Sequence, residues 1–256
     1  MKLHYEIYDF SKPWLKKTPL ILIHGIAANL KMWFFQVPEF SKEFPVILID
    51  LPGHGKSPEP EKEMTIEDIA KSVHETLKEI GVSKVNMLGI SMGAVVALEY
   101  ASAYSHQIDK LILASMPGMI PNDVKPMLQA LIEMNKTASR DEIVSNFFKN
   151  YNAFGIDKSM ELFDFAYEMF AQTKHSAYMK VVGWGLVYHL NSKFKTIRNK
   201  TLVMNGEIDN LTPCMLAEAA SKEMQDATFH VLKNTGHICS MDNPEEFNKK
   251  VLEFLK

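Results

Sequence analysis

The sequence predicts an α/β fold, with a mostly parallel sheet, helices on both of its faces and a helical segment inserted into it. Short apolar runs rich in β-branched residues alternate with stretches of helical period in the first half of the chain. This alternation resumes near the C-terminus, after a long segment that shows helical patterns alone. A Gly-x-Ser-x-Gly turn also joins a strand-like run to a helix-like one. Together these observations indicate one α/β domain with an insertion.

The strand and helix signals follow one another in a regular order. Residues 3–10 alternate polar and apolar side chains, as in a strand. Helical stretches lie at 65–80 and 92–103, each about long enough for a crossover between parallel strands, and a last helix is expected at 244–255. The other strand-like runs are residues 20–23, 46–49, 85–88, 111–113, 201–204 and 228–232. We therefore expect about seven strands.

The segment between the two halves of the sheet differs in pattern. It is rich in aromatic residues and methionines and shows helical patterns at 124–134, 140–150 and 158–172. We predict a core domain of residues 1–116 and 198–256 and a helical cap of residues 117–197. Most of the cap aromatics should pack the cap onto the core, and a minority should line an apolar pocket. Trp184 is our candidate in the cap for substrate binding.

Composition excludes several classes of protein. The chain has 256 residues and a formal net charge of −3, with no basic block of the kind that binds nucleic acid. Its two cysteines, Cys214 and Cys239, lack the spacing of a redox pair or a metal site. We predict no metal, no cofactor and no nucleic-acid partner.

The N-terminal residues alternate in polarity and do not resemble a signal peptide. No apolar run approaches the roughly 18 residues that a membrane span needs. We therefore expect a soluble cytoplasmic protein with no membrane partner, as a monomer or a homodimer.

The turn Gly89-Ile90-Ser91-Met92-Gly93 is the most informative segment. Such a sharp turn strains the serine backbone, and glycines two residues before and after it keep side chains away from the neighbouring strand and helix. The Ser91 hydroxyl is then exposed at the carboxyl edge of the sheet. Because a free serine hydroxyl is a poor nucleophile, Ser91 requires a histidine as base and an acid that orients this histidine.

Nine histidines compete for the role of base. His237 lies on a glycine turn between the last strand and the last helix, which places it at the same sheet edge as Ser91. His24 and His54 also adjoin glycines, but nearer the N-terminus, and we expect them to bond within their turns and shape them. The remaining histidines should pack or lie on the surface, namely His4, His74, His106, His175, His189 and His230.

Asp209 is the predicted acid, because it follows the strand at 201–204 in a turn that precedes His237. Glu207 is the nearby alternative, and either residue could instead serve the turn alone. The chain order Ser91, Asp209, His237 is the order noted for serine hydrolases on this kind of sheet.

Acyl transfer also needs hydrogen-bond donors for the oxyanion of the tetrahedral intermediate. Two backbone N–H groups are candidates for this oxyanion hole. Met92 begins the helix after the nucleophile, at the positive end of the helix dipole, and Ile26 follows the strand at 20–23 in a His-Gly turn.

Five segments occur in a familiar order over residues 20–247, namely HGIAAN, DLPGHGKS, GISMGA, GEIDNLTP and GHICSMDNPEEF. They resemble the α/β-hydrolase superfamily, in its cap-bearing esterase and lactonase branch. The resemblance implies Ser91 as nucleophile, His237 as base, Asp209 as its partner, and Ile26 and Met92 as oxyanion donors, in agreement with the assignments above.

The resemblance also implies that Trp33 lies near the acyl pocket, with a place in the core as the alternative. Many relatives begin with a two-stranded hairpin, whereas here one strand precedes residue 20, so the first strand of the family is missing. Serine at the nucleophile position argues against relatives that open epoxides or remove halides through a carboxylate.

Our main hypothesis is a serine hydrolase that cleaves small-molecule carboxylic esters with a small to medium apolar acyl or aryl group. The same triad could instead hydrolyse an enol-lactone, a thioester or a carbon–carbon bond. The cap holds only one arginine, Arg140, which argues against a polyanionic substrate. A different class of function is a slow-turnover ligand sensor on the same fold.

Overall fold

The computed structural model describes residues 1–10, 17–119, 122, 126, 130, 133, 137–150, 153–155, 160–185 and 190–256. The side chains of residues 150 and 181–185 lie outside this description. The helix predicted over 124–134 falls mostly outside the described residues.

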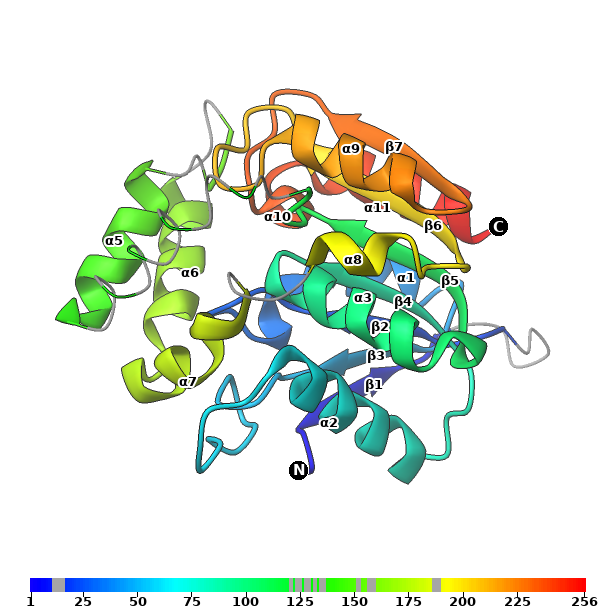
Figure 1. The fold of residues 1–256 in the computed structure, drawn as a ribbon, viewed down its shortest axis with the longest axis horizontal. Helices are drawn as coiled ribbons and strands as arrows, with labels where there is room; N and C mark the ends of the chain where they lie inside the picture. The colour runs from blue at the N-terminus through cyan, green and yellow to red at the C-terminus, as the bar shows by residue number, and fades with distance from the viewer. Residues whose placement is uncertain are drawn as a thin grey trace.

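The sheet has seven strands in the order β1-β3-β2-β4-β5-β6-β7 (Figure 1). Strand β1 is antiparallel to β3, and all other neighbours are parallel. The predicted fold class and strand number are confirmed. The strands are β1 (Tyr5–Tyr8), β2 (Leu20–Ile23), β3 (Val46–Ile49), β4 (Val85–Ile90), β5 (Ile108–Ala114), β6 (Lys200–Gly206) and β7 (Ala227–Leu232).

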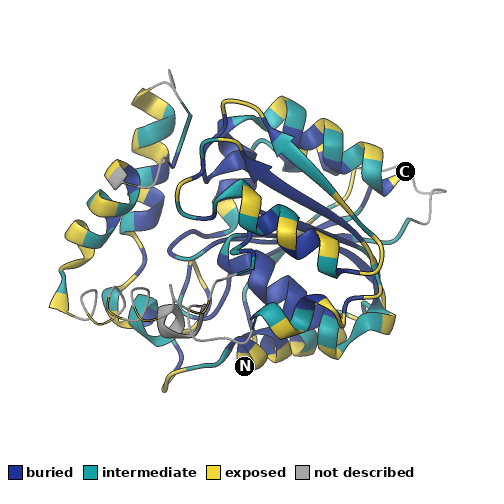
Figure 2. Cartoon of the chain, turned by 45° about the horizontal axis from the view of Figure 1, so that its top comes forward, coloured by how far each residue is buried: buried dark blue, intermediate teal, exposed yellow. Residues whose placement is uncertain are grey.

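Helices cover both faces of the sheet because both faces are apolar. In β2, Ile21 and Ile23 belong to one core cluster while Leu20 and Leu22 belong to the other, and all four are fully buried. The first cluster is completed by α2 (Ile66–Glu79), α3 (Met92–Ala103), α8 (Leu190–Phe194) and α9 (Cys214–Glu223). The second includes residues of η1 (Leu30–Trp33), α1 (Val37–Phe40), α10 (Cys239–Asp242) and α11 (Pro244–Leu255). Figure 2 shows the buried strands between helices with exposed outer surfaces.

Local sequence signals fix the ends of α2. Thr65 Oγ1 accepts a hydrogen bond from Asp68 N at 3.1 Å, and Asp68 Oδ2 accepts one from Thr65 N at 3.1 Å, which is a capping box. The helix ends before Gly81, whose φ of 75° is accessible to glycine without strain. A short helix η2 (Ser105–Gln107) follows α3 and leads into β5.

The helices described between β5 and β6 are α5 (Arg140–Asn150), α6 (Met160–Ala171), α7 (His175–Gly185) and then α8; all four lie in the segment predicted as the cap. Helices α5 and α6 pack against each other at one side of the sheet (Figure 1). Lys180 of α7 bonds to Glu59 Oε1 at 3.0 Å and joins the cap to the loop after β3. Helix α8 lies within the predicted cap range but packs on α3 and α9 of the core.

Candidate active site

Ser91 lies between β4 and α3 in a strained backbone conformation, with φ 54° and ψ −120°. Its N–H donates to the carbonyl oxygen of Ala114 at 2.9 Å. A Cβ on Gly89 would lie 2.1 Å from the carbonyl oxygen of Gly93, and one on Gly93 would lie 2.2 Å from that of Ile23. The turn therefore requires glycine on both sides of Ser91, as its spacing predicted.

The structure brings Ser91, Asp209 and His237 together. His237 Nε2 lies 2.9 Å from Ser91 Oγ, and His237 Nδ1 lies 2.8 Å from Asp209 Oδ2. A carboxylate can only accept a hydrogen bond, so the proton of the neutral imidazole belongs on Nδ1 and Nε2 accepts from the serine hydroxyl. The alternative acid, Glu207, instead bonds to Lys233 Nζ at 2.7 Å and is exposed.

Asp209 is held in place by the turn that contains it. Its Oδ1 accepts from the N–H groups of Leu211 and Thr212, each at 2.9 Å, and its Oδ2 accepts from Thr212 Oγ1. Burial opposes ionisation of this carboxyl, but the electrostatic attraction to His237 and the hydrogen bonds from His237 and Thr212 outweigh it and hold the pKa of Asp209 below its usual value. Asp209 therefore faces His237 as a fixed carboxylate.

Two buried side chains hold the loop of His237, and no sequence pattern predicted either of them. Ser115, after β5 with φ 45°, donates from Oγ to the carbonyl oxygen of His237 at 2.7 Å. Asp242 Oδ2 accepts from the N–H of Gly236, and also from that of Gly155 in the cap at 2.7 Å. The base is thus positioned both by the sheet and by the cap.

The two predicted oxyanion donors adjoin the nucleophile. Met92 is the first residue of α3, and Ile26 lies in the turn after β2. A Cβ on Gly25 would lie 3.3 Å from Ser91 Cβ, so this turn runs directly beside the serine. Within the described part of the chain, the N–H groups of Ile26 and Met92 have no hydrogen-bond acceptor.

His24 and His54 make the turn-shaping contacts that the sequence predicted. His54 Nε2 accepts from the N–H of Ala27 at 3.0 Å, and His24 Nε2 accepts from that of Leu51 at 2.9 Å. The Nδ1 atoms donate to the carbonyl oxygens of Gly25 and Pro52. Burial lowers the pKa of His24 to about 4 and that of His54 to about 3, so both rings are neutral.

Asp50 is a further buried acid that sequence reasoning missed. Its carboxylate accepts from the N–H groups of Leu30 and Lys56 at 2.8 and 2.9 Å and pairs with His4 Nδ1 at 3.0 Å. Gly55, with φ 51°, leaves room for it, because a Cβ there would lie 2.2 Å from Asp50 Oδ2. Asp50 therefore joins the loops after β2 and β3. In the sequence, this role was indicated only by the position of Asp50 shortly before the Pro-Gly-His-Gly turn.

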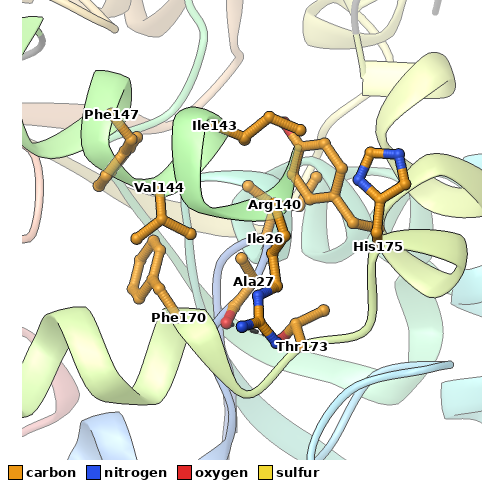
Figure 3. Close-up of a pocket in the computed structure, with 10 residues that line it drawn as sticks. Ile26, Ala27, Arg140, Ile143, Val144, Phe147, Phe170, Thr173 and His175 are labelled. Carbon is orange, nitrogen blue, oxygen red and sulfur yellow. Dashed lines mark hydrogen bonds between the residues drawn. The ribbon is translucent and has the colours of Figure 1, made fainter. Parts of the chain in front are cut away.

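Two adjoining cavities open beside the triad and share the side chains of Ile26, Phe147 and Phe170. The inner one, about 290 Å³ including space open to solvent, is lined by Ser91 and His237 and otherwise mainly by apolar residues. The Phe147 ring meets His237 edge-on at 5.8 Å and stacks on Phe170 at 5.1 Å. The outer cavity, about 420 Å³ on the same measure, is shown in Figure 3 and is also lined by Ala27, Arg140, Ile143, Val144, Thr173, His175 and Tyr178.

Comparison with known proteins agrees with this architecture. A family model described as alpha/beta hydrolase fold matches residues 18–137, and one described as TAP-like protein matches residues 174–256. The solved enol-lactonase of Burkholderia xenovorans superimposes with a TM-score of 0.88 at 21% identity, covering 99% of this chain and 96% of that one. The chain has the α/β-hydrolase fold and resembles the α/β-hydrolase superfamily.

An esterase from Exiguobacterium antarcticum is also similar in structure, with a TM-score of 0.88, 23% identity and coverage of 99% of this chain and 95% of that one. The 2-hydroxy-6-oxo-6-(2'-aminophenyl)hexa-2,4-dienoic acid hydrolase of Metapseudomonas resinovorans is 24% identical over 94% of this chain and 84% of that protein. These similar proteins thus include hydrolases with different substrates, and they support hydrolase activity without indicating one substrate.

Trp33 does not line the inner cavity beside Ser91, where the resemblance implied it. It is fully buried in the core, and its neighbour Met32 lines the inner cavity. Successive residues of the 3₁₀-helix η1 point about 120° apart, so only one of the two can face the cavity. The side chain of Trp184 lies outside the described residues.

The described residues lack two features. No helix among them combines the length and apolar character that a membrane-spanning segment requires. No group of three or more His, Cys, Asp or Glu side chains in the same residues could hold a metal ion.

Proposed function

We propose that this protein is a serine hydrolase that cleaves carboxylic esters with a small to medium apolar acyl or aryl group. One observation carries the proposal: the chain of hydrogen bonds from Asp209 through His237 to Ser91 ends at the wall of an apolar cavity. An acyl group in this cavity lies next to the serine hydroxyl, with Phe147 and Phe170 as apolar walls.

In the first half of the reaction, His237 Nε2 takes the proton of Ser91 as Oγ attacks the ester carbonyl. The N–H groups of Ile26 and Met92 stabilise the oxyanion of the tetrahedral intermediate. The resulting imidazolium, held by Asp209, returns its proton to the departing alcohol, which leaves an acyl-serine. Water, activated by His237, then releases the acid and regenerates the enzyme.

A second candidate uses the same triad on an enol-lactone or on a carbon–carbon bond next to a ketone. The similarity to an enol-lactonase and to a dienoic acid hydrolase favours it. Both candidates need Ser91 and His237, and a panel of simple esters, enol-lactones and vinylogous diketones separates them by relative kcat/KM.

The test is turnover of p-nitrophenyl acetate, butyrate, hexanoate and octanoate by the wild type, by Ser91→Ala and by Ser83→Ala. Ser83 is exposed in the loop before β4 and serves as the matched control. We expect repeated turnover by the wild type and by Ser83→Ala, and loss of at least 10³-fold in kcat for Ser91→Ala. Equal rates for Ser91→Ala and the wild type would refute the proposal, and a few slow turnovers with tight product binding would instead indicate a sensor.

A further inference from the structure

The outer cavity carries one cationic side chain on otherwise mainly apolar walls. Arg140 is the first residue of α5 and one of only two arginines in the chain, whose other basic residues are lysines. Figure 3 shows its side chain running from α5 along the cavity, with the guanidinium group near Thr173 and Ala27. A planar guanidinium binds a carboxylate through two parallel hydrogen bonds, which an ammonium group cannot do.

The walls on both sides of Arg140 are fixed by hydrogen bonds. At the start of α5, Ser139 Oγ accepts from the N–H of Glu142 at 3.3 Å, and Glu142 Oε2 accepts from that of Ser139 at 2.8 Å. On the opposite wall, Thr173 Oγ1 donates to the carbonyl oxygen of Ala27 at 2.9 Å, next to the predicted oxyanion donor Ile26. The backbone that carries Arg140 is thus held at a set position relative to the turn beside Ser91.

The interactions of the guanidinium leave donors for a ligand. Its Nε and Nη2 both lie near Oδ1 of Asp141, at 3.4 and 3.3 Å, and the Asp141 side chain is 76% exposed. So long and exposed a pair contributes little, and a carboxylate in the cavity can replace it. The remaining three N–H groups have no acceptor among the described residues.

His175 supplies a second polar group on the wall of the same cavity. His175 Nδ1 is buried and makes no hydrogen bond within the described part of the protein. Buried polar atoms in folded proteins are nearly always paired, so the Nδ1 atom on this cavity wall can form a hydrogen bond with a polar atom of a ligand that enters the cavity.

We propose that Arg140 binds a carboxylate at the far end of the substrate, so that the preferred ester carries one carboxylate separated from the scissile carbonyl by an apolar segment. The inference rests on the proposed function and names its substrate class. Because the two cavities share Ile26, Phe147 and Phe170, a single molecule can reach from Ser91 to Arg140. The single arginine suits one carboxylate, in keeping with the expectation that the substrate is not a polyanion.

The test compares substrates of equal length that differ only in a carboxylate. Mono-p-nitrophenyl glutarate carries it on the acyl side, with p-nitrophenyl valerate as the neutral match, and succinate and adipate monoesters vary its distance. On the alcohol side, 4-acetoxybenzoate is compared with 4-methylphenyl acetate. Each pair is measured with the wild type, Arg140→Gln, Arg140→Lys and the control Arg198→Gln. Arg198 is exposed and lies outside the predicted cap.

We expect Arg140→Gln to lower kcat/KM for at least one carboxylate substrate by about 10- to 100-fold, mainly through KM, while its neutral match changes less than about twofold. Arg140→Lys should recover part of the loss, and Arg198→Gln should behave as the wild type. Equal changes for the charged and the neutral substrates, in every pair, would overturn the inference.

Binding to Ser91→Ala separates this inference from the proposed function. Calorimetric titration with monomethyl glutarate should give tighter binding to Ser91→Ala than to the double variant with Arg140→Gln, whereas methyl valerate should not distinguish them. Arg140-dependent binding without ester turnover by the wild type would refute the ester-hydrolase proposal alone. Ester turnover with carboxylate binding that is independent of Arg140 would refute this inference alone.

Discussion

Acidification should destabilise the protein through His24 and His54. Both rings are fully buried and neutral, and the Nε2 of each accepts a backbone hydrogen bond that protonation would break. Their pKa values fall from 6.5 to about 4 and about 3 in the folded state. Since the unfolded chain binds these protons more readily, the stability is full above pH 6.5 and is lost as the pH falls from 6.5 toward 4.

The magnitude follows from linkage. Because pH 5 lies about 1.5 pH units below a pKa of 6.5, protonation at this pH stabilises an unfolded histidine by about 2 kcal/mol relative to a folded ring that stays neutral. The two rings together should therefore lower the free energy of unfolding by about 4 kcal/mol between pH 7.5 and pH 5. That is a large share of the roughly 5–15 kcal/mol that stabilises a typical domain.

Urea unfolding followed by tryptophan fluorescence at pH 5.0, 5.5, 6.0, 6.5 and 7.5 measures this loss. Between pH 5 and 6 we expect a slope approaching 2.7 kcal/mol per pH unit from the two histidines, and about half of it in His54→Gln. The control variant His106→Gln, at an exposed position, should keep the full slope. A free energy of unfolding that stays level from pH 7.5 to 5.5 would refute the reasoning.

Three further predictions concern the site. Asp209→Asn should lower kcat for p-nitrophenyl acetate by roughly 10³- to 10⁴-fold with little change in KM, because the wrong histidine tautomer is favoured; a loss below tenfold would contradict this. Gly89→Ala should lower the thermal unfolding midpoint far more than Gly81→Ala, because a Cβ at Gly89 would overlap backbone atoms, whereas a Cβ at Gly81 meets nothing within 4 Å and only the positive φ adds strain there; similar shifts would count against it. Ser115→Ala should lower kcat several-fold by loosening the His237 loop, and unchanged steady-state kinetics would remove this residue from the account.

The strands predicted with the correct bounds are those in which every residue is apolar. Strands β2 and β3 are continuous apolar runs buried on both faces, and their predicted and observed bounds agree. Strand β5 begins three residues earlier than predicted, because Asp109 and Lys110 at its exposed start interrupt the apolar pattern. The short helices α1 and α10 were not predicted, since four residues hold too little periodicity to recognise.

The same distinction applies to the site. The nucleophile, base and acid each lie on a turn with its own local signal, and the structure places them within hydrogen-bond distance. Ser115, Asp242 and Arg140 lack such a signal, because their contacts join segments far apart in the chain or depend on how the cap meets the core. Packing of this kind also decides that Met32 and not Trp33 faces the cavity.

The central claim is that Ser91 is a nucleophile activated by His237. Labelling with a fluorophosphonate, followed by peptide mass spectrometry, tests it most directly. We predict a single adduct on the peptide that contains Ser91, absent in Ser91→Ala and formed at least 10³-fold more slowly in His237→Ala. Labelling at another residue, or equal labelling of Ser91→Ala and the wild type, would contradict it.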